Sequence, residues 1–463
     1  MAAAADVVRR GGRTHLTEPP QGTSRGDPLS RAVGRCGWDR ARIPAADSVV
    51  TTSYRPRRSA LRFSPHTPTR SRAESPPTRA PRRDGRVREI DVLRGFALLG
   101  ILLVNVQAMA GPHMGPGGQP ITSRADEVAA WLVTALVGSK FYLLFSFLFG
   151  YSFTLQRASA ERAGVAFAPR HLRRLACLFL LGLAHGVLLF DGDVLMIYAV
   201  LGLVLLAVRD IAPHTAVWAA AWFVAGASVC LLARGLITVA FSEPARPQDI
   251  AAWGHEMVTA YRGDPGSIVQ ANLQSLRGRL GGNIVYGADV LAAFLVGLAA
   301  GTRGVLAAPG RYRAWMVRIV TWGLPIGLAG SVFMAVCRDG PLDSRWYDVG
   351  SAVGVLTAPA LTAAYVCGLL LLLHTRPGRR VGDALAPAGR LALTNYLTQS
   401  LVMALVFTGY GLAGYGRYGT VAVLAGCCVL YAAQLAVSGW LTRHVGYGPA
   451  EWLLRAVTLA HRP

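Results

Sequence analysis

The stretch from Leu172 to Val208 constrains the fold most; it reads LRRLACLFLLGLAHGVLLFDGDVLMIYAVLGLVLLAV. From Leu175 onward it is apolar apart from His185 and the acidic turn Asp-Gly-Asp at 191–193. A helix that crosses a membrane needs roughly 20 apolar residues, so this run is too long for one crossing and just enough for two. Asp-Gly pairs favour tight turns. We therefore expect a helical hairpin of two short arms, bent at residues 191–193.

An ionisable side chain lies inside this hairpin. His185 is six residues before Asp191, about two helical turns deeper in the membrane. An ionisable group at such a depth is costly and indicates a functional site, and an imidazole suits proton transfer at neutral pH. His185 is therefore a candidate general base, with Asp193 or Asp191 orienting the ring as a carboxylate does in a catalytic triad. The alternatives are that His185 only joins two helices and that the aspartates only form the turn.

Composition favours a multi-span membrane protein. The 463 residues are 52% hydrophobic and 16% charged, with a mean hydropathy of +0.37. Because long uncharged runs recur, we expect an all-α bundle of about ten transmembrane helices. The net charge of +22 does not indicate nucleic-acid binding, because half of it lies in residues 1–89 and most of the rest in short loops. The seven cysteines include no C-x-x-C pair, so we expect neither a disulfide framework nor a metal site.

The chain divides into a tail and a membrane domain. Residues 1–86 are rich in Arg, Pro and Ser and have no sustained apolar period, so we expect a disordered cytoplasmic tail. Residues 87–463 form the transmembrane domain, with a polar loop at 242–282 and an amphipathic C-terminal segment at 446–458. In that segment Glu451 and Arg455 stand four residues apart, which predicts an ion pair. The expected spans are 90–110, 128–155, 175–190, 194–208, 216–241, 283–301, 315–337, 349–374, 391–411 and 421–441.

The arginines predict the orientation of these spans. With the N-terminus inside, the inner loops carry 17 arginines without counting the tail, and the outer loops carry eight. Positive charge favours cytoplasmic loops. We therefore expect a multi-pass protein of the plasma (inner) membrane with both termini cytoplasmic and the Asp-Gly-Asp turn facing outward.

Polar residues also mark one face of the first span. Asp91 and Arg94 are three residues apart, and Asn105 follows Arg94 by eleven residues, about three turns later on the same face. Arg94 is a candidate ligand for a phosphate or carboxylate, and Asn105 a candidate donor to a developing oxyanion. The alternatives are an interfacial ion pair for Arg94 and a helix–helix contact for Asn105.

Four further candidates lie elsewhere. Tyr198 lies one to two turns into the second arm of the hairpin, where it would face the same cavity as His185. His113, in the loop GPHMGPGG, is another candidate base or an ordinary exposed histidine. Asn395 and Gln399, in GRLALTNYLTQS, indicate either a polar lumen that binds substrate or a helix contact.

Several of these strings together resemble one family. They are DVLRGFALLGILLVN, KFYLLFSFLFGYSF, RRLACLFLLGLAHGVLLFDGDVLMIYAVLG, GRLALTNYLTQS and GPAEWLLRAVT. In this order they look like the successive motifs of the YeiB-like family, catalogued as domain of unknown function 418, and the resemblance runs from Arg88 to the end of the chain. That family is similar to membrane acyltransferases that move acyl groups onto envelope sugars.

One branch of those enzymes, the heparan-glucosaminide acetyltransferases, is similar to this chain in its first helix. Its arginine-glycine and valine-asparagine pairs match Arg94-Gly95 and Val104-Asn105. The catalytic histidine of that branch falls eleven residues later, where this chain has Pro116. The residue-by-residue resemblance therefore ends at Asn105.

The resemblance and the polar residues together predict an inner-membrane acyltransferase. It would take an acyl group from a cytoplasmic donor such as acyl-CoA, with no permanently bound cofactor, and deliver it to an extracytoplasmic glycan or lipid. Arg94 would bind the donor, Asn105 would polarise the acyl carbonyl, and His185 with Asp193 would deprotonate the acceptor. Two alternatives use the same residues: a transporter for a small anionic or amphipathic solute, and a membrane protein without turnover.

Overall fold

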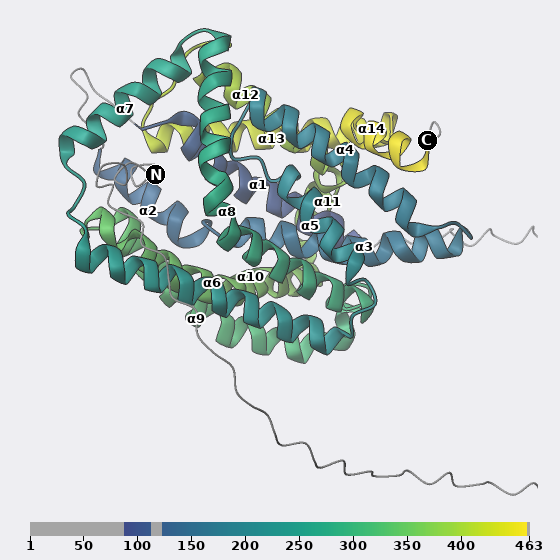
Figure 1. Ribbon diagram of the computed structural model, residues 1–463. Coiled ribbons are helices and arrows are strands. Elements are labelled where there is room, and N and C mark those ends of the chain that lie inside the picture. Colours follow the sequence, from purple (N-terminus) through teal and green to yellow (C-terminus); the bar gives the residue numbers. More distant parts are fainter. Residues whose placement is uncertain (1–87, 113–122, 461–463) are drawn as a thin grey trace, which may run out of the picture. The chain divides into compact units, whose positions relative to one another are not determined.

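The computed structural model describes residues 88–112 and 123–460, and for residues 280–283 the backbone alone. The predicted disordered tail, residues 1–86, and the candidate base His113 lie outside the described residues. Within those ranges the chain forms helices and no strand, which confirms the predicted all-α class (Figure 1). The α-helices are α1 (Arg88–Ala110), α2 (Arg124–Leu136), α3 (Lys140–Arg162), α4 (Phe167–Leu188), α5 (Leu195–Ala207), α6 (Pro213–Phe241), α7 (Pro247–Arg262), α8 (Pro265–Thr302), α9 (Arg313–Asp339), α10 (Tyr347–Leu372), α11 (Arg376–Arg390), α12 (Ala392–Phe407), α13 (Thr420–His444) and α14 (Pro449–Leu459).

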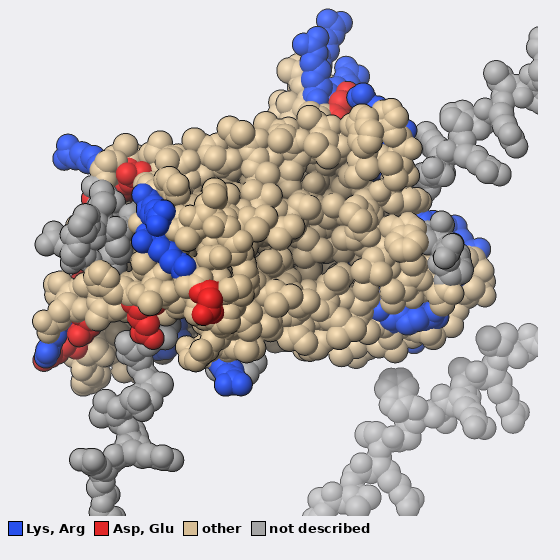
Figure 2. All heavy atoms as spheres, turned by 90° about the horizontal axis from the view of Figure 1, so that it is seen from above, with Lys and Arg blue, Asp and Glu red and all other residues tan. Residues whose placement is uncertain are grey.

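The predicted spans coincide with the apolar helices. In the described part of the chain, eight helical segments are long and apolar enough to cross a membrane, and α5 and α12 are shorter apolar helices. Together they account for the ten predicted segments. Figure 2 shows one face of the molecule whose middle is covered by uncharged side chains, while Lys, Arg, Asp and Glu gather toward its edges. This distribution is typical of a membrane-embedded bundle.

The hairpin of α4 and α5 forms as predicted, with the turn at 191–193 between its arms. Gly182 lets the arms close, because a β-carbon at this position would collide with the Asp193 carboxylate and the backbone nitrogen of Met196. α5 has 13 residues. That length corresponds to about 20 Å, which is less than the apolar thickness of a bilayer of about 30 Å. The second arm is therefore shorter than the apolar layer of a typical bilayer.

The predicted span at 128–155 is broken in the structure. α2 ends at Leu136, α3 begins at Lys140, and Ser139 between them has a left-handed backbone with φ of 67°. The reason is Lys140, whose ammonium would be costly inside an uninterrupted apolar helix. At the break the buried Nζ atom donates to the Thr134 carbonyl at 3.3 Å. The lysine thus lies at the start of a helix and not part-way along one.

The predicted polar loop at 242–282 was wrong, because this region is helical. It forms α7 and the first half of α8, which continues without interruption into the span at 284–302. Two helix-start signals explain the outcome: Pro247 stands in the first turn of α7, and the Asp264 side chain accepts from Ser267 N at 2.8 Å ahead of α8. In Figure 1 the first half of α8 stands across the direction of α6 and α10.

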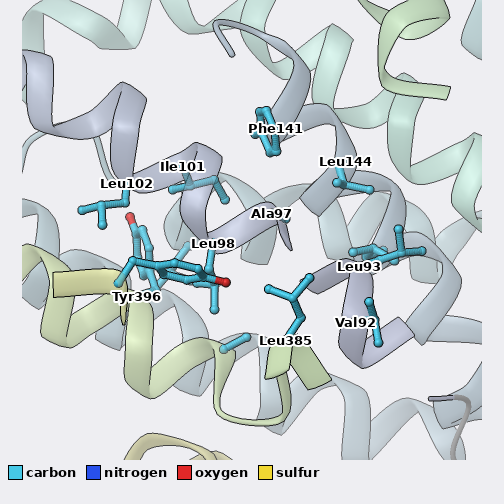
Figure 3. Packing of buried hydrophobic residues seen from close by; sticks show 14 of the residues in the cluster. Val92, Leu93, Ala97, Leu98, Ile101, Leu102, Phe141, Leu144, Leu385 and Tyr396 are labelled. Atoms are coloured by element: carbon cyan, nitrogen blue, oxygen red, sulfur yellow. The ribbon is translucent and has the colours of Figure 1, made fainter. Parts of the chain in front are cut away.

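The amphipathic helix α11 was not predicted, because its sequence is too polar to resemble a span. It packs closely against α1, and glycines permit the approach: a β-carbon at Gly95 would collide with the Leu385 carbonyl, and one at Gly389 with the Asp91 carbonyl. Figure 3 shows Leu385 on one side of α1 and Phe141 on the other. α1 therefore lies inside the bundle, between α3 and α11 and in contact with α12 and α13.

A reciprocal pair of glycines joins α3 to the membrane-spanning half of α8. A β-carbon on Gly150 would collide with the Phe294 carbonyl, and one on Gly297 would collide with the Phe147 carbonyl. Small residues that bring two backbones together are the usual means of helix association in membranes, where no hydrophobic effect drives helices together. α3 and α8 thus form one closely packed unit.

Candidate functional site

His185 and Asp193 meet at the closed end of the α4–α5 hairpin. His185 Nδ1 lies 2.9 Å from Asp193 Oδ1, and both side chains are almost fully buried, at 1% and 0% exposure. The contact is an ion-pair distance without the angle of a linear hydrogen bond. The other carboxylate oxygen, Oδ2, accepts from Met196 N at 2.9 Å and caps the start of α5. The sequence motif therefore places an imidazole and a carboxylate together, with the carboxylate held by the backbone.

The His185 ring packs against a tyrosine that sequence analysis did not select. The rings of His185 and Tyr396 lie 5.0 Å apart between centroids, and Tyr396 comes from α12. Neither His185 Nε2 nor the Tyr396 hydroxyl has a hydrogen-bond partner of ordinary geometry in the described part of the chain, although the Val194 backbone approaches the hydroxyl. Buried polar atoms normally find partners. Two such atoms on rings that pack against each other make this a candidate place for a ligand or water to bind.

The signal for Tyr396 was present in the sequence. It stands inside GRLALTNYLTQS, directly after Asn395 and three residues before Gln399, both of which were selected because they are polar. A tyrosine in an apolar helix is common and carries no sign of function by itself. Tyr396 becomes a candidate only through the packing of the helices, because α12 packs against α1, as Figure 3 shows at Tyr396, and brings this ring to His185.

Asp191 has a different partner from Asp193. Its carboxylate forms an ion pair of 2.8 Å with Arg279 in the first half of α8. The same stretch of α8 is tied to α4 by Asn272, which donates to the Val187 carbonyl at 3.1 Å. Burial, followed by the charge of Asp191, raises the pKa of Tyr261 in α7 to about 12. α8 and α7 therefore cover the turn, and the buried His185 ring can meet a substrate only when this cover or a neighbouring helix moves.

Two arginines on α1 and α4 lie near each other. Arg94 of α1 lies 3.4 Å from Asp91 and donates to the Ser152 hydroxyl of α3 at 2.5 Å. Arg174 of α4 lies close enough for its charge to act on Arg94, and its Nε atom is buried without a hydrogen-bond partner in the described part of the chain. Two guanidinium groups held this close favour an anion between or beside them.

On α1 and on α4, an arginine is followed eleven residues later by another polar residue. Arg174 and His185 are eleven residues apart on α4, as Arg94 and Asn105 are on α1. Eleven residues are close to three full turns, about 16 Å, so each pair lies on one face of its helix. On each helix the polar residue therefore lies about 16 Å along the axis from the arginine. Asn105 is half-buried, and no contact joins it to His185 among the described residues.

Three candidates from the sequence serve as contacts between helices. The buried Tyr198 hydroxyl lies 2.7 Å from the Ser146 hydroxyl of α3 and turns away from the hairpin. Asn395 Nδ2 donates to the Ser438 hydroxyl at 3.0 Å, and Gln399 Nε2 donates to Gln434 Oε1 at 2.8 Å. For Tyr198, Asn395 and Gln399 these hydrogen bonds fit a role in joining helices. A role of these residues in substrate binding stays a prediction.

Glu451 also has a different partner from the one predicted. Its carboxylate does not pair with Arg455 but caps α12, accepting from Leu393 N at 2.8 Å and from Thr394 N at 3.0 Å. Arg455 instead lies over the Tyr447 ring. A carboxylate at a helix N-terminus binds exposed N–H groups and the positive end of the helix dipole, which outweighs a surface ion pair. The C-terminal segment thereby fixes the start of the helix that carries Tyr396.

The fold and the site define a class: a multi-span α-helical membrane protein with a histidine–carboxylate pair buried inside the bundle. Within that class the chain belongs to the YeiB-like family; the model of the family described as "Protein of unknown function (DUF418)" matches residues 300–461. The chain is 31% identical over 397 residues to "Uncharacterized protein YxaH" of Bacillus subtilis (strain 168), which covers 81% of this chain and 94% of the relative. It is 29% identical over 391 residues to "Uncharacterized protein YeiB" of Escherichia coli (strain K12), covering 80% and 95%. The family resemblance seen in the sequence is therefore confirmed.

Proposed function

We propose that this membrane protein is an acyltransferase that moves an acyl group from a cytoplasmic donor to a hydroxyl or amine of an extracytoplasmic glycan or lipid. The observation that carries the proposal is the buried pair of His185 and Asp193, in which Nδ1 lies 2.9 Å from the carboxylate and neither ring nitrogen has a hydrogen bond of ordinary geometry in the described part of the chain. In a catalytic triad the carboxylate orients one ring nitrogen, and the other ring nitrogen takes the proton from the substrate.

The proposed reaction uses the pair in one proton transfer. The acceptor O–H or N–H gives its proton to His185 Nε2 while its lone pair attacks the acyl carbonyl carbon. The imidazolium is stabilised by Asp193. The bond between the acyl carbon and the donor sulfur then breaks, and the proton passes from His185 to the leaving thiolate. Tyr396, whose hydroxyl lies in the same place, would hydrogen-bond to the oxyanion that forms between these steps.

The two inner arginines would hold the donor. A phosphate of the donor would bind Arg94 and Arg174, and an extended chain would carry the thioester over the distance of about 16 Å to the level of His185. Asn105, at the matching level of α1, would polarise the acyl carbonyl. This arrangement gives the three sequence candidates on α1 and α4 one common path, and it requires no permanently bound cofactor.

The orientation follows from the same arginines. We propose that the protein lies in the plasma (inner) membrane with both termini in the cytoplasm, since the arginine-rich loops lie at the end where the donor would bind. A thiol-specific, membrane-impermeant reagent should label a cysteine placed at Gly192 in intact cells. Labelling only after lysis would reverse the orientation.

A transporter for a small anionic or amphipathic solute is the rival candidate. It is favoured by the acid Asp289, buried within the membrane-spanning half of α8, because such acids mark ion and proton pathways in transporters. The rival predicts movement of a solute without any change in its bonds, whereas the enzyme produces an acylated acceptor.

The test is transfer of a radiolabelled acyl group by the purified protein in liposomes. With acetyl-CoA as the probe donor and total envelope lipids and glycans as acceptors, label should appear in the acceptor fraction. His185→Gln keeps a hydrogen-bonding side chain but removes the base, so transfer should fall by about 10²–10⁴-fold. Asp193→Asn should lower transfer less, because Asp193 does not take the proton itself.

The matched control is His171→Gln. His171 is a second buried histidine of α4, packed against the Phe153 ring at 4.9 Å, so this variant tests for non-specific damage to the helix. Equal losses for His171→Gln and His185→Gln would refute the assignment of the base. Uptake of an unmodified solute into the same liposomes, without acyl transfer, would favour the transporter.

A further inference from the structure

A second buried acid lies in the membrane-spanning half of α8. Asp289 is five residues into the apolar segment Ile284–Thr302, and the residue is 1% exposed. One carboxyl oxygen, Oδ2, accepts a hydrogen bond from the Tyr142 hydroxyl of α3. The other, Oδ1, is buried and has no hydrogen-bond partner in the described part of the chain. This acid is distinct from the His185–Asp193 pair and takes no part in the reaction proposed above.

In the part of the chain that the structure describes, no cation forms an ion pair with Asp289. Its sequence neighbour Val290 and the nearby Phe294 are fully buried apolar side chains. The ring of Tyr286 lies 4.9 Å from that of Tyr142. α8 packs against α3, α4, α5, α6 and α7. Several ionisable groups of these helices and of α8 itself have partners other than Asp289: Lys140 has the Thr134 carbonyl, Arg279 has Asp191, Arg234 has Asp348, His185 has Asp193, and Tyr198 has Ser146.

These contacts decide the charge of the carboxyl. An ionised carboxylate buried without a cation is costly, and one hydroxyl does not replace the water it loses. Protonation removes this cost, and Oδ1, which has no other donor, is the oxygen left to carry the proton. We propose that Asp289 is a proton-binding site inside the membrane, which takes up its proton on Oδ1 while Tyr142 holds Oδ2. The proposal does not depend on the acyltransferase assignment.

A short path joins this site to the break between α2 and α3. The Ser139 side chain also interacts with the Tyr142 hydroxyl, and Ser139 is half-buried where Asp289 is fully buried. The hydroxyls of Ser139 and Tyr142 thus form a continuous series from the break to the acid. The left-handed backbone of Ser139 turns the chain at this point. The break therefore provides a route by which Asp289 exchanges its proton.

The test is infrared difference spectroscopy of the full chain in liposomes, because it detects protonated carboxyl groups without a substrate or a reagent. As the pH is lowered, the wild type should show the carbonyl stretch of a buried carboxylic acid, and Asp289→Asn should lose it. Asp193→Asn should keep the band, since this variant leaves Asp289 and its contact with Tyr142 in place. Tyr142→Phe should shift the band, because the hydrogen bond to Oδ2 is lost.

The matched control is Tyr286→Phe, which removes a hydroxyl from the same aromatic pair but no hydrogen bond to Asp289. This variant should leave the band in place. Absence of the band from the wild type at every pH at which it stays folded would overturn the proposal, as would a band unchanged in Asp289→Asn. If Asp289→Asn does not fold, Tyr142→Phe decides: a band that does not move excludes Asp289 as its source.

Discussion

Arg279 and Asp191 form an ion pair of 2.8 Å between the first half of α8 and the turn of the α4–α5 hairpin. The pair lies directly beside the turn that brings Asp193 to His185. The pair joins α8, which covers the site, to the turn that carries Asp193. The Arg279 side chain is half exposed, and the Asp191 side chain is mostly buried. Ion pairs of this kind are modest in energy, which suits a contact that has to open for substrate to enter.

Arg279→Ala should loosen this cover without unfolding the bundle. We expect faster backbone hydrogen exchange in residues 265–279 and in the turn, because Asp191 loses its partner, while exchange in α3 stays unchanged. Mass spectrometry of the exchanged protein in detergent measures this. Arg277→Ala is the control, since Arg277 is exposed on the same turn and forms no ion pair among the described residues. Equal acceleration in both variants would mean that Arg279 does not hold the cover closed.

Tyr396→Phe and Tyr431→Phe should have opposite effects on stability. The Tyr396 hydroxyl has no well-formed hydrogen bond in the described part of the chain, so its removal should leave the free energy of unfolding unchanged or slightly higher. Tyr431 donates to the Gly95 carbonyl at 2.6 Å, so its loss should cost about 1 kcal/mol. Thermal unfolding in one detergent compares the two.

Acyl transfer provides the second measurement for this pair of variants. Tyr396→Phe should lower the rate although the protein is as stable as the wild type, because the oxyanion loses a donor. Tyr431→Phe should transfer at the normal rate below its melting temperature. A Tyr396→Phe protein with full activity would remove Tyr396 from the proposed site.

Gly297→Ala should weaken the contact between α3 and α8. The added β-carbon collides with the Phe147 carbonyl, which is backbone and cannot rotate away. Overpacking of this kind typically costs about 1–3 kcal/mol. The measurement is the melting temperature in detergent, and Gly426→Ala on α13 is the control because a β-carbon there meets nothing within 4 Å. The control should be neutral or slightly stabilising, since alanine favours helix more than glycine does.

Glu451→Gln should destabilise the start of α12. The carboxylate accepts two backbone N–H groups and the Thr394 hydroxyl, and a neutral amide keeps only part of this capping. A cap of this kind is worth about 1–2 kcal/mol. Arg455→Ala should cost much less, because Arg455 takes no part in the cap. If the two variants melt at the same temperature, the cap contributes little.

The sequence was most informative where one strong signal acted alone. Hydropathy located the ten apolar segments, and Asp-Gly located the hairpin turn, because both depend on local chemistry. It failed where a tertiary contact outweighed a local preference. The predicted span at 128–155 is broken next to Lys140, whose Nζ atom donates to the Thr134 carbonyl. The polar residues 247–279 are helical because α7 and α8 pack over the hairpin.

In the candidate site, contacts between residues close in the sequence could be predicted, and contacts between distant helices could not. His185 and Asp193 could be paired in advance because one turn separates them along the chain. Tyr396 and Asp289 could not be assigned their neighbours, because those come from α4 and α3 and depend on how the helices pack. Asp289 did give a signal, an acid within the apolar string NIVYGADVLAAFLVGL, but the string alone names no partner.

α8 is one continuous helix of 38 residues, and it carries Arg279 near its middle and Asp289 ten residues later. If α8 rotates as one body so that its first half leaves the hairpin, the side chains around Asp289 move as well. The two equilibria then share one coupling free energy, and the coupling is reciprocal. A solute that binds more tightly when the cover is open must change the proton affinity of Asp289 by some factor, and a change in pH must change the affinity for that solute by the same factor.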